Sequence, residues 1–414
     1  MNIYGIIILS AIIIGFVVDF IADNLNISNL KKELPKEFVG VYDDEKYSKS
    51  QEYTVVNTKF GYITTVFGFV VTLTFWFSGG FPWLNEIGKS LFQSEIARGI
   101  FFISALLIAN SIIELPFGIY STFVIEEKFG FNKTTAKTYI LDLLKSILLS
   151  VVIGLPVLGL LLYLLGNSEL YAYGLAWLAT VIIGLIIQYI APVVFLPLFN
   201  KFVPLEDGEL KSAIFNFAEK VKYPLKNIFV MDGSKRSTKS NAFFIGFGKN
   251  KRIVLFDTLI EKHSVDELVS ILAHEIGHFK KRHILTGTII GYIRLAVIFC
   301  LLSLFIHQKG LHEAFFMNDI TIYAGLLFFG MLYSPIDLFL SIYSNILSRK
   351  HEYEADKYAA INTGNPEAMI NALKKLSEHN LSNLTPHPFY VFLHYSHPTV
   401  LERIEAIRRV KTEK

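Results

Sequence analysis

Seven long apolar segments dominate the sequence and limit what the chain can fold into. Each has about the length that an α-helix needs to cross the hydrocarbon core of a bilayer, roughly 20 residues. The composition agrees, since 52% of the 414 residues are hydrophobic and only 18% are charged, against about 25% in ordinary soluble domains. We expect a mainly α, polytopic membrane protein with transmembrane helices at 3–21, 61–78, 99–123, 145–166, 171–195, 286–306 and 321–345.

The charges between these segments predict how they are oriented. Lys and Arg concentrate in 22–60, in 124–144, in 200–285 and in the tail after 348, whereas the intervening loops are poor in them. Because rich and poor loops alternate through all seven spans, the positive-inside rule puts the N-terminus outside and the stretches 200–285 and 346–414 in the cytosol.

Net charge and cysteine content exclude other classes of protein. A net charge of +3 is too small to indicate a nucleic-acid partner, and a single cysteine, Cys300, excludes a disulfide scaffold. Cys300 lies in an apolar run, so we expect a buried thiol. The ionisable residues at membrane depth either line a polar interior or pair with one another; they are Asp19, Glu114, Arg294 and Asp337.

The spans divide the chain into four parts: 1–199 with five helices, an insert at 200–285, 286–345 with helices six and seven, and a helical part at 346–414. Within the insert, apolar spacing predicts an amphipathic helix over 207–222. Short β-branched or aromatic runs predict three strands and a small antiparallel sheet; they lie at Asn227–Asp232, at Ser240–Gly248, which closes in a glycine turn, and at Arg252–Asp257.

A helix predicted from Val265 carries the pattern that points to chemistry. Ser264 can cap it, with Glu267 completing a capping box. Inside it lie His274, Glu275 and His278, the H-E-x-x-H spacing in which two imidazoles share a helix face and bind zinc while the glutamate acts as general base. The bare pattern also fits a helix with two solvated histidines. The apolar stretch before it favours burial, and buried histidines need partners.

A catalytic zinc needs a third protein ligand. His283 follows soon after the motif, but its basic surroundings are more typical of the membrane boundary. Glu352 is the better candidate, with Asp356 four residues later on the same helix face and able to orient a ligating imidazole. Glu354 points to another face. Alone, this stretch would read as a solvated charged helix, and the H-E-x-x-H motif favours the ligand interpretation.

Several separate motifs in order resemble one family, the type-1 CAAX prenyl proteases, which are integral-membrane zinc endopeptidases that process farnesylated proteins. The resemblance covers nearly the whole chain. The motifs that carry it are Leu34-Pro35, Tyr47 to Ser50 with Tyr53, Ile125 to Asn132, Ser234 to Ser237, Ser240-Asn241-Ala242, His274 to His278, Glu352 to Asp356, and Ser396-His397-Pro398 with Arg403.

The resemblance implies roles for individual residues. It implies one Zn²⁺ per chain held by His274, His278 and Glu352, and Glu275 as general base. It implies further site residues: Asp356 beside the ligands or donating a proton, Asn241 near the substrate backbone on an edge strand, and His397 and Arg403 lining the cleft, where they could steady an oxyanion. The sequence has each of these residues at the stated position.

The resemblance also implies a fold and a setting. Seven helices enclose an intramembrane chamber, and a gluzincin-type α+β zinc protease domain lies on the cytosolic side. The partners are a peptide or protein substrate, prenylated or apolar-tailed, and the lipid bilayer, with the oligomeric state open. The Ile, Lys and Asn usage hints at a prokaryotic source, hence a cell (inner) membrane and no certain prenylated substrate. A eukaryotic source would mean the endoplasmic reticulum membrane, again with the site facing the cytosol.

Two alternatives stay open at this point. A membrane quality-control metalloprotease of the heat-shock type would share the metal site but typically has four spans. A transporter or scaffold with a vestigial metal site would be expected to lack a ligand or the base, yet His274, Glu275, His278 and Glu352 are all present.

Overall fold

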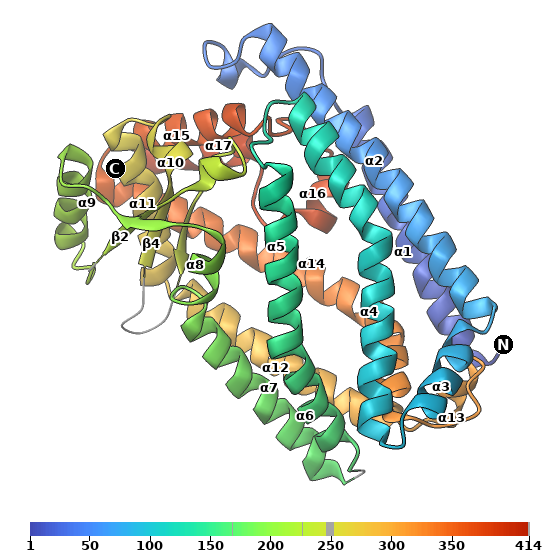
Figure 1. The fold of residues 1–414 in the computed structure, drawn as a ribbon. Coiled ribbons are helices and arrows are strands. Elements are labelled where there is room, and N and C mark those ends of the chain that lie inside the picture. Colours follow the sequence, from blue (N-terminus) through green and yellow to red (C-terminus); the bar gives the residue numbers. More distant parts are fainter. Residues whose placement is uncertain (168, 226, 246–251, 413–414) are drawn as a thin grey trace.

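The computed structural model describes residues 1–167, 169–225, 227–245 and 252–412 and is mostly helical (Figure 1). Within these residues, seven helical stretches are long and apolar enough to cross a membrane, one at each predicted position. Most extend beyond the apolar runs, because polar residues continue the helices past the membrane. Their bounds are α1 Ile3–Ser28, α2 Asp44–Phe77, α4 Glu95–Tyr120 with a π-helical turn to Glu126, α5 Ala136–Leu149 leading into α6 Leu155–Leu165, α7 Leu170–Ile190, α12 His283–Phe305 and α14 Ile322–Thr363.

The fourth span is interrupted in its middle. A π-helical turn, Ser150–Gly154, separates α5 from α6. Pro156 lies at the start of α6, and since proline has no backbone N–H, the regular hydrogen-bond ladder cannot pass through this point. The two helices nevertheless continue as one membrane-crossing stretch of 30 residues, Ala136–Leu165.

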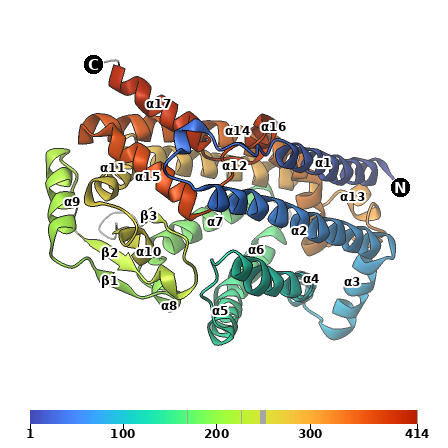
Figure 2. The ribbon, with the colours of Figure 1, turned by 90° about the horizontal axis from the view of Figure 1, so that it is seen from above.

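Contacts between successive spans form a closed circuit. Helix α1 packs on α2, α4 on α6, α6 on α7, α7 on α12, α12 on α14, and α14 returns to α1, as the view from above shows for α1, α12 and α14 (Figure 2). Phe67 of α2 meets Phe117 of α4, which joins the remaining pair. Arg294 of α12 pairs with Asp337 of α14, so two of the ionisable groups at membrane depth stabilise each other.

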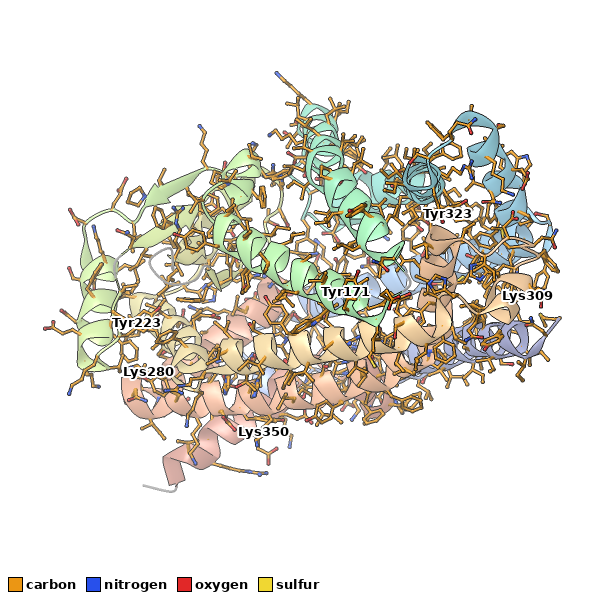
Figure 3. All side chains as sticks on the ribbon, turned by 90° about the horizontal axis from the view of Figure 1, so that it is seen from below. Tyr171, Tyr223, Lys280, Lys309, Tyr323 and Lys350 are labelled. Atoms are coloured by element: carbon orange, nitrogen blue, oxygen red, sulfur yellow. The ribbon has the colours of Figure 1, made fainter. Side chains whose placement is uncertain are left out.

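A compact aromatic core closes the end of the molecule that lies away from the C-terminus. Short helices α3 (Gly80–Leu91) and α13 (Lys309–Glu313) cover it. Trp76 is fully buried there, stacks on Phe315 and donates its indole N–H to the Ala314 carbonyl at 2.9 Å. Figure 3 shows Lys309 and Tyr323 at this end and Lys280 at the opposite end. The two ends are therefore built separately, a packed cap on one side and the insert on the other.

The insert forms a mixed four-stranded sheet. Its strands are β1 Phe202–Pro204, β2 Ile228–Met231, β3 Ala242–Ile245 and β4 Arg252–Phe256, in the order β1-β2-β4-β3. The predicted antiparallel sheet is wrong in one respect, because β2 and β4 pair in parallel; the chain crosses to the far edge to form β3 before it returns as β4. The strand β1 was missed, since three residues ending in proline give no period-two pattern. The predicted glycine turn lies outside the described residues.

Helices cover this sheet. The predicted helix over 207–222 is α9, Glu209–Lys220, and it packs against α11, Val265–Lys280. The helix α8 (Phe195–Phe199) leads into the insert, and α10 (Asp257–Ile260) follows β4. Arg236 ties the insert to the membrane part, because its guanidinium makes two hydrogen bonds to the Asp142 carboxylate of α5, at 2.7 and 2.9 Å.

The C-terminal part packs on both the insert and the loop between α1 and α2. Its helices are α15 Pro366–His379, α16 Pro388–His394 and α17 Val400–Thr412. Phe38, Tyr42 and Tyr47 from the loop and start of α2 share a hydrophobic cluster with Ile404 and Ile407 of α17. The predicted boundary at 345 is crossed by α14 without a break. Cys300 is exposed on α12, so the expectation of a buried thiol is wrong.

Candidate metal centre

Helix α11 starts where the sequence predicts and turns its motif inward. The Ser264 side chain accepts from the Glu267 backbone N–H, and the Glu267 carboxylate accepts from the Ser264 backbone N–H, which is the predicted capping box. Leu268 and Leu272 enter the hydrophobic core of the insert. His274, on the same helix, is buried with them. The helix is thus fixed at its start and along one face, which leaves its imidazoles little freedom.

The opposing wall of the site is α14, which runs unbroken from a membrane span into the site. It meets α11 where Gly277 faces Ala355. A Cβ added at Gly277 would lie 3.1 Å from the Ala355 Cα and 3.2 Å from its carbonyl oxygen. A side chain at this position would be tightly packed against the α14 backbone, so the two helices would have to move apart slightly. The glycine inside the H-E-x-x-H motif therefore brings Glu352, one turn away on α14, within reach of the two histidines.

The three predicted ligands converge on one point. The Nε2 atoms of His274 and His278 are 3.1 Å apart, and the Glu352 carboxylate oxygens lie 3.2 Å from His278 Nε2 and 3.5 Å from His274 Nε2. In the described residues, these three side chains form the group whose ligand atoms lie close enough together to hold one metal ion. A tetrahedral zinc with bonds of about 2.0–2.1 Å would hold its ligand atoms about 3.3 Å apart. The donor set and its spacing fit such an ion.

One buried atom of this group has no hydrogen-bond partner in the described part of the chain. It is Oε2 of Glu352, on a side chain that is 6% exposed. An ionised oxygen buried without a hydrogen bond is costly. A cation bound between the carboxylate and the imidazoles would remove that cost, so the orphaned oxygen is a second reason to regard the cluster as a metal site.

Carboxylates make the surroundings of His274 favourable for positive charge. Burial opposes the charged ring, but the neighbouring carboxylates of Asp356 and Glu352 outweigh it and raise the pKa of His274 to about 9. His274 Nδ1 lies 2.8 Å from Asp356 Oδ1. Arg403 in turn donates to both oxygens of Asp356, at 2.8 and 2.7 Å, and its Nη1 lies 3.5 Å from Glu352. Arg403 is therefore engaged with the carboxylates.

Glu275 follows the first histidine on α11 and is half buried. Burial raises the pKa of its carboxyl group, and the neighbouring histidines oppose that rise. A carboxylate that is less acidic than usual is a better proton acceptor near neutral pH. The position and the environment suit the predicted general base.

The other two predicted site residues are exposed. His397 is exposed, and its Nε2 is 3.4 Å from Glu352 Oε1. Asn241 is exposed directly before β3, the edge strand of the sheet, and its side chain accepts from the Ala242 N–H at 2.8 Å. The structure brings His397 to the ligand cluster, and it places Asn241 on the sheet edge, with β3 in contact with α11.

The chain before Asn241 is held from several elements. The Lys239 ammonium lies 2.9 Å from the Glu126 carboxylate and donates to the Tyr53 hydroxyl at 2.8 Å. Asn380 makes two hydrogen bonds with the Ser240 backbone, one to its N–H and one to its carbonyl. Two of the motifs in the membrane part, at Tyr53 and at Glu126, thus serve to fix the start of the edge strand.

His283 and Glu354 lie near the ligands but were not predicted to belong to the site. His283, at the start of α12, is buried with its Nδ1 3.0 Å from His278 Nδ1, and its Nε2 is 3.1 Å from Glu354 Oε2. The expectation that His283 only marks the membrane boundary is therefore incomplete. A histidine close behind a ligand pair was the available signal; the turn that folds it back was not visible in the sequence.

Seven spans and a buried His-His-Glu cluster on the H-E-x-x-H helix define a class of protein, the membrane metallopeptidases. The comparisons with known proteins give the family. Residues 24–201 match the model described as the CAAX prenyl protease N-terminal, five membrane helices, and residues 204–411 match that of peptidase family M48. The chain belongs to the CAAX prenyl protease 1 group of family M48.

Individual relatives agree over nearly full length. CAAX prenyl protease 1 homologues from Oryza sativa and Homo sapiens are 37% and 32% identical, covering 92% and 91% of this chain and 91% and 89% of theirs. The crystal structure of S. mikatae Ste24p superposes with a TM-score of 0.93 at 34% identity, covering 98% of this chain and 99% of that one. These results select the protease over a transporter or scaffold and over the heat-shock type.

The source of the relatives corrects one expectation. They are eukaryotic, from Oryza sativa, Saccharomyces cerevisiae and Homo sapiens among others. The hint of a prokaryotic source, taken from the Ile, Lys and Asn usage, is not borne out. Amino-acid usage follows genome composition as well as lineage, so it carries little information about the domain of life.

Proposed function

We propose that this chain is a zinc endopeptidase that cleaves near the C-terminus of CAAX-type proteins, prenylated or apolar-tailed. In this proposal His274, His278 and Glu352 hold one Zn²⁺ and Glu275 is the general base. The observation that carries it is the convergence of three ligand atoms, one of them a buried carboxylate oxygen without a hydrogen bond. The relatives' printed names, CAAX prenyl protease 1 and its homologues, support the substrate class.

The residues divide the work of hydrolysis among them. A bound zinc supplies an activated water and polarises the peptide carbonyl. Glu275 takes the proton of the attacking water and passes it to the leaving amine. Asp356 orients His274 through its Nδ1, and Arg403 holds Asp356 in place. We assign Arg403 this supporting role, because its donors are directed at Asp356 and Glu352, and leave stabilisation of the oxyanion to the exposed His397.

The substrate backbone has an edge to pair with. Among the described residues, β3 is the last strand of its sheet and pairs on one side, with β4. An extended peptide can add to such an edge by main-chain hydrogen bonds, and this mode of binding depends little on its side chains. Asn241 would meet the peptide at the start of that edge. The closed circuit of spans supports the predicted intramembrane chamber, through which an apolar tail could approach.

The setting follows from the same features. We propose that the metal site faces the cytosol, and the basic residues of 200–285 and of the tail support this under the positive-inside rule. For a eukaryotic chain like its relatives, we propose the endoplasmic reticulum membrane.

The direct test uses purified full-length protein and two peptides of one sequence that ends in a CAAX motif, one farnesylated and one not. We expect about one tightly bound zinc per chain, cleavage of the farnesylated peptide, loss of cleavage with a chelator such as phenanthroline, and recovery on adding zinc at low concentration. Absence of bound metal from protein with both histidines intact would overturn the proposal, and so would cleavage that persists after the metal is removed.

A further inference from the structure

The two histidines of the metal site are supported in different ways. His274 meets a carboxylate directly, with Asp356 Oδ1 2.8 Å from its Nδ1. His278 has no carboxylate at that position in the described structure. Its Nδ1 faces another imidazole nitrogen instead, Nδ1 of His283, at 3.0 Å. The support that ligating histidines require on their second nitrogen must come to His278 through this contact.

A reversal of the chain creates the contact. Helix α11 ends at Lys280 and α12 begins at His283. Between them Arg282 adopts φ +61°, a left-handed conformation that non-glycine residues adopt only at some cost. The turn folds the first side chain of α12 back onto the last turn of α11. His283 is 7% exposed as a result, although it starts a membrane span.

His283 is itself held on two further sides. Its Nε2 lies 3.1 Å from Glu354 Oε2, and its ring stacks on that of His351 with centroids 3.9 Å apart and planes 8° from parallel. Both partners lie on α14, beside the ligand Glu352. Figure 3 shows Lys280, the last residue of α11, and Lys350 of α14 at the same end of the molecule. The ring of His283 therefore has a defined position and a defined plane.

We infer that His283 is a positioning residue for the metal ligand His278, acting as a relay between it and Glu354. If His278 Nε2 binds the metal, its ring proton is on Nδ1 and is donated to His283 Nδ1. His283 must then carry its own proton on Nε2, which it donates to the Glu354 carboxylate. One tautomer of each ring satisfies the metal bond and both hydrogen bonds. Glu354 therefore fixes the ring of His278 through one intervening residue, His283. This inference rests on the proposed function, because it takes His278 as a ligand.

Zinc dissociation tests the relay, because a positioning role predicts faster loss of metal without loss of the fold. Outer partners of a metal site are worth about 10–100-fold in metal affinity. In purified full-length protein, His283→Phe keeps a ring against His351 but removes both hydrogen bonds, and we expect zinc to dissociate into excess chelator about 10–100-fold faster. His283→Gln offers an amide that can accept from one partner and donate to the other, and it should restore most of the retention.

A matched pair on the surface of α14 supplies the control. Glu354→Ala removes the end of the relay from a side chain that is 38% exposed, so it should fold and also lose zinc faster. Lys350→Ala alters the neighbouring charge, 4.0 Å from the same carboxylate, and should leave the zinc dissociation rate unchanged. Glu354→Ala decides the matter if His283→Phe does not fold.

The outcomes separate the two proposals. Unaltered protein without bound zinc would refute the proposed function and the relay together. Unaltered protein with zinc, and a Glu354→Ala or a well-folded His283→Phe that releases it at the same rate, would refute the relay alone. Acceleration by Lys350→Ala as large as that by Glu354→Ala would also refute it, because the effect would then be general destabilisation.

Discussion

In the proposed mechanism Glu275 has to accept and release a proton, whereas the proposed ligands have only to hold an ion. Its half-buried position raises the pKa of its carboxyl group, which moves the group towards the range where it can do both. The substitution Glu275→Gln changes one atom and leaves the volume nearly the same. It therefore separates proton transfer from metal binding.

We expect Glu275→Gln to keep its zinc and to lose about 10²- to 10⁴-fold in kcat, the usual contribution of a general base. The measurements are the metal content of purified protein and its turnover of a CAAX peptide. Turnover equal to that of the unaltered protein would show that another group accepts the proton.

Glu352→Ala should instead weaken the binding of zinc. Removing the carboxylate leaves His274 and His278 as the only two protein ligands of the proposed set and removes a negative charge that favours a cation. Zinc affinity should fall by more than the roughly 10–100-fold that outer partners contribute. Competition with a chelator of known affinity measures it, and zinc binding as tight as in the unaltered protein would exclude Glu352 from the ligand set.

At the scale of residues, the sequence predicts which side chains can serve as ligands better than it predicts which side chains contact one another. The spacing in H-E-x-x-H predicts His274 and His278 on one face, because helix periodicity is local. Glu352 could be proposed only because a metal needs a third ligand. The contact between His278 and His283 depends on the conformation of Arg282, which nothing in the local pattern indicates.

At the scale of elements, the site exists because α11 and α14 approach closely at Gly277. Gly277→Ala would place a Cβ against the backbone of Ala355, and overpacking of this kind costs about 1–3 kcal/mol. The better helix propensity of alanine offsets about 0.5–1 kcal/mol of that. The two helices should separate slightly, so we expect a lower melting temperature together with faster release of zinc.

The matched control is Gly287→Ala on α12, where an added Cβ meets nothing within 4 Å. It should leave the melting temperature unchanged or slightly raised and leave zinc release unaltered. Two variants with the same melting temperature and the same zinc release would show that the helices tolerate the methyl group and that the glycine is not needed for the approach.

Elements themselves were predicted unevenly. The capped helix α11 was predicted to begin at Val265, as it does, because a capping box is a local signal. The sheet was predicted with the wrong pairing between β2 and β4, because strand order depends on contacts between distant residues that alternation along the chain does not encode. The extension of α14 past residue 345 was not predicted either, since a fall in hydropathy looks like the end of a span even where the helix continues.

On the scale of the whole molecule, the arrangement of seven spans was predictable, because length and apolar character are properties of each segment alone. The circuit that closes them was implied only by resemblance. The molecule combines two environments, the apolar helices of the spans and the hydrogen-bonding edge of the sheet in the insert. A substrate with an apolar tail and an extended peptide would meet both, and the two contributions can be measured separately.

Asn241→Ala should weaken cleavage of the farnesylated and the unprenylated peptide by the same factor. The side chain holds the start of β3 through the Ala242 N–H and lies at the edge where a peptide strand would pair. Loss of one such hydrogen bond is worth about 0.5–1.5 kcal/mol, hence about 2- to 13-fold in kcat/KM for each peptide. Zinc content should not change, because Asn241 is outside the ligand set. A loss confined to the farnesylated peptide would place Asn241 in lipid recognition, and a loss of zinc would show that it supports the fold of the site.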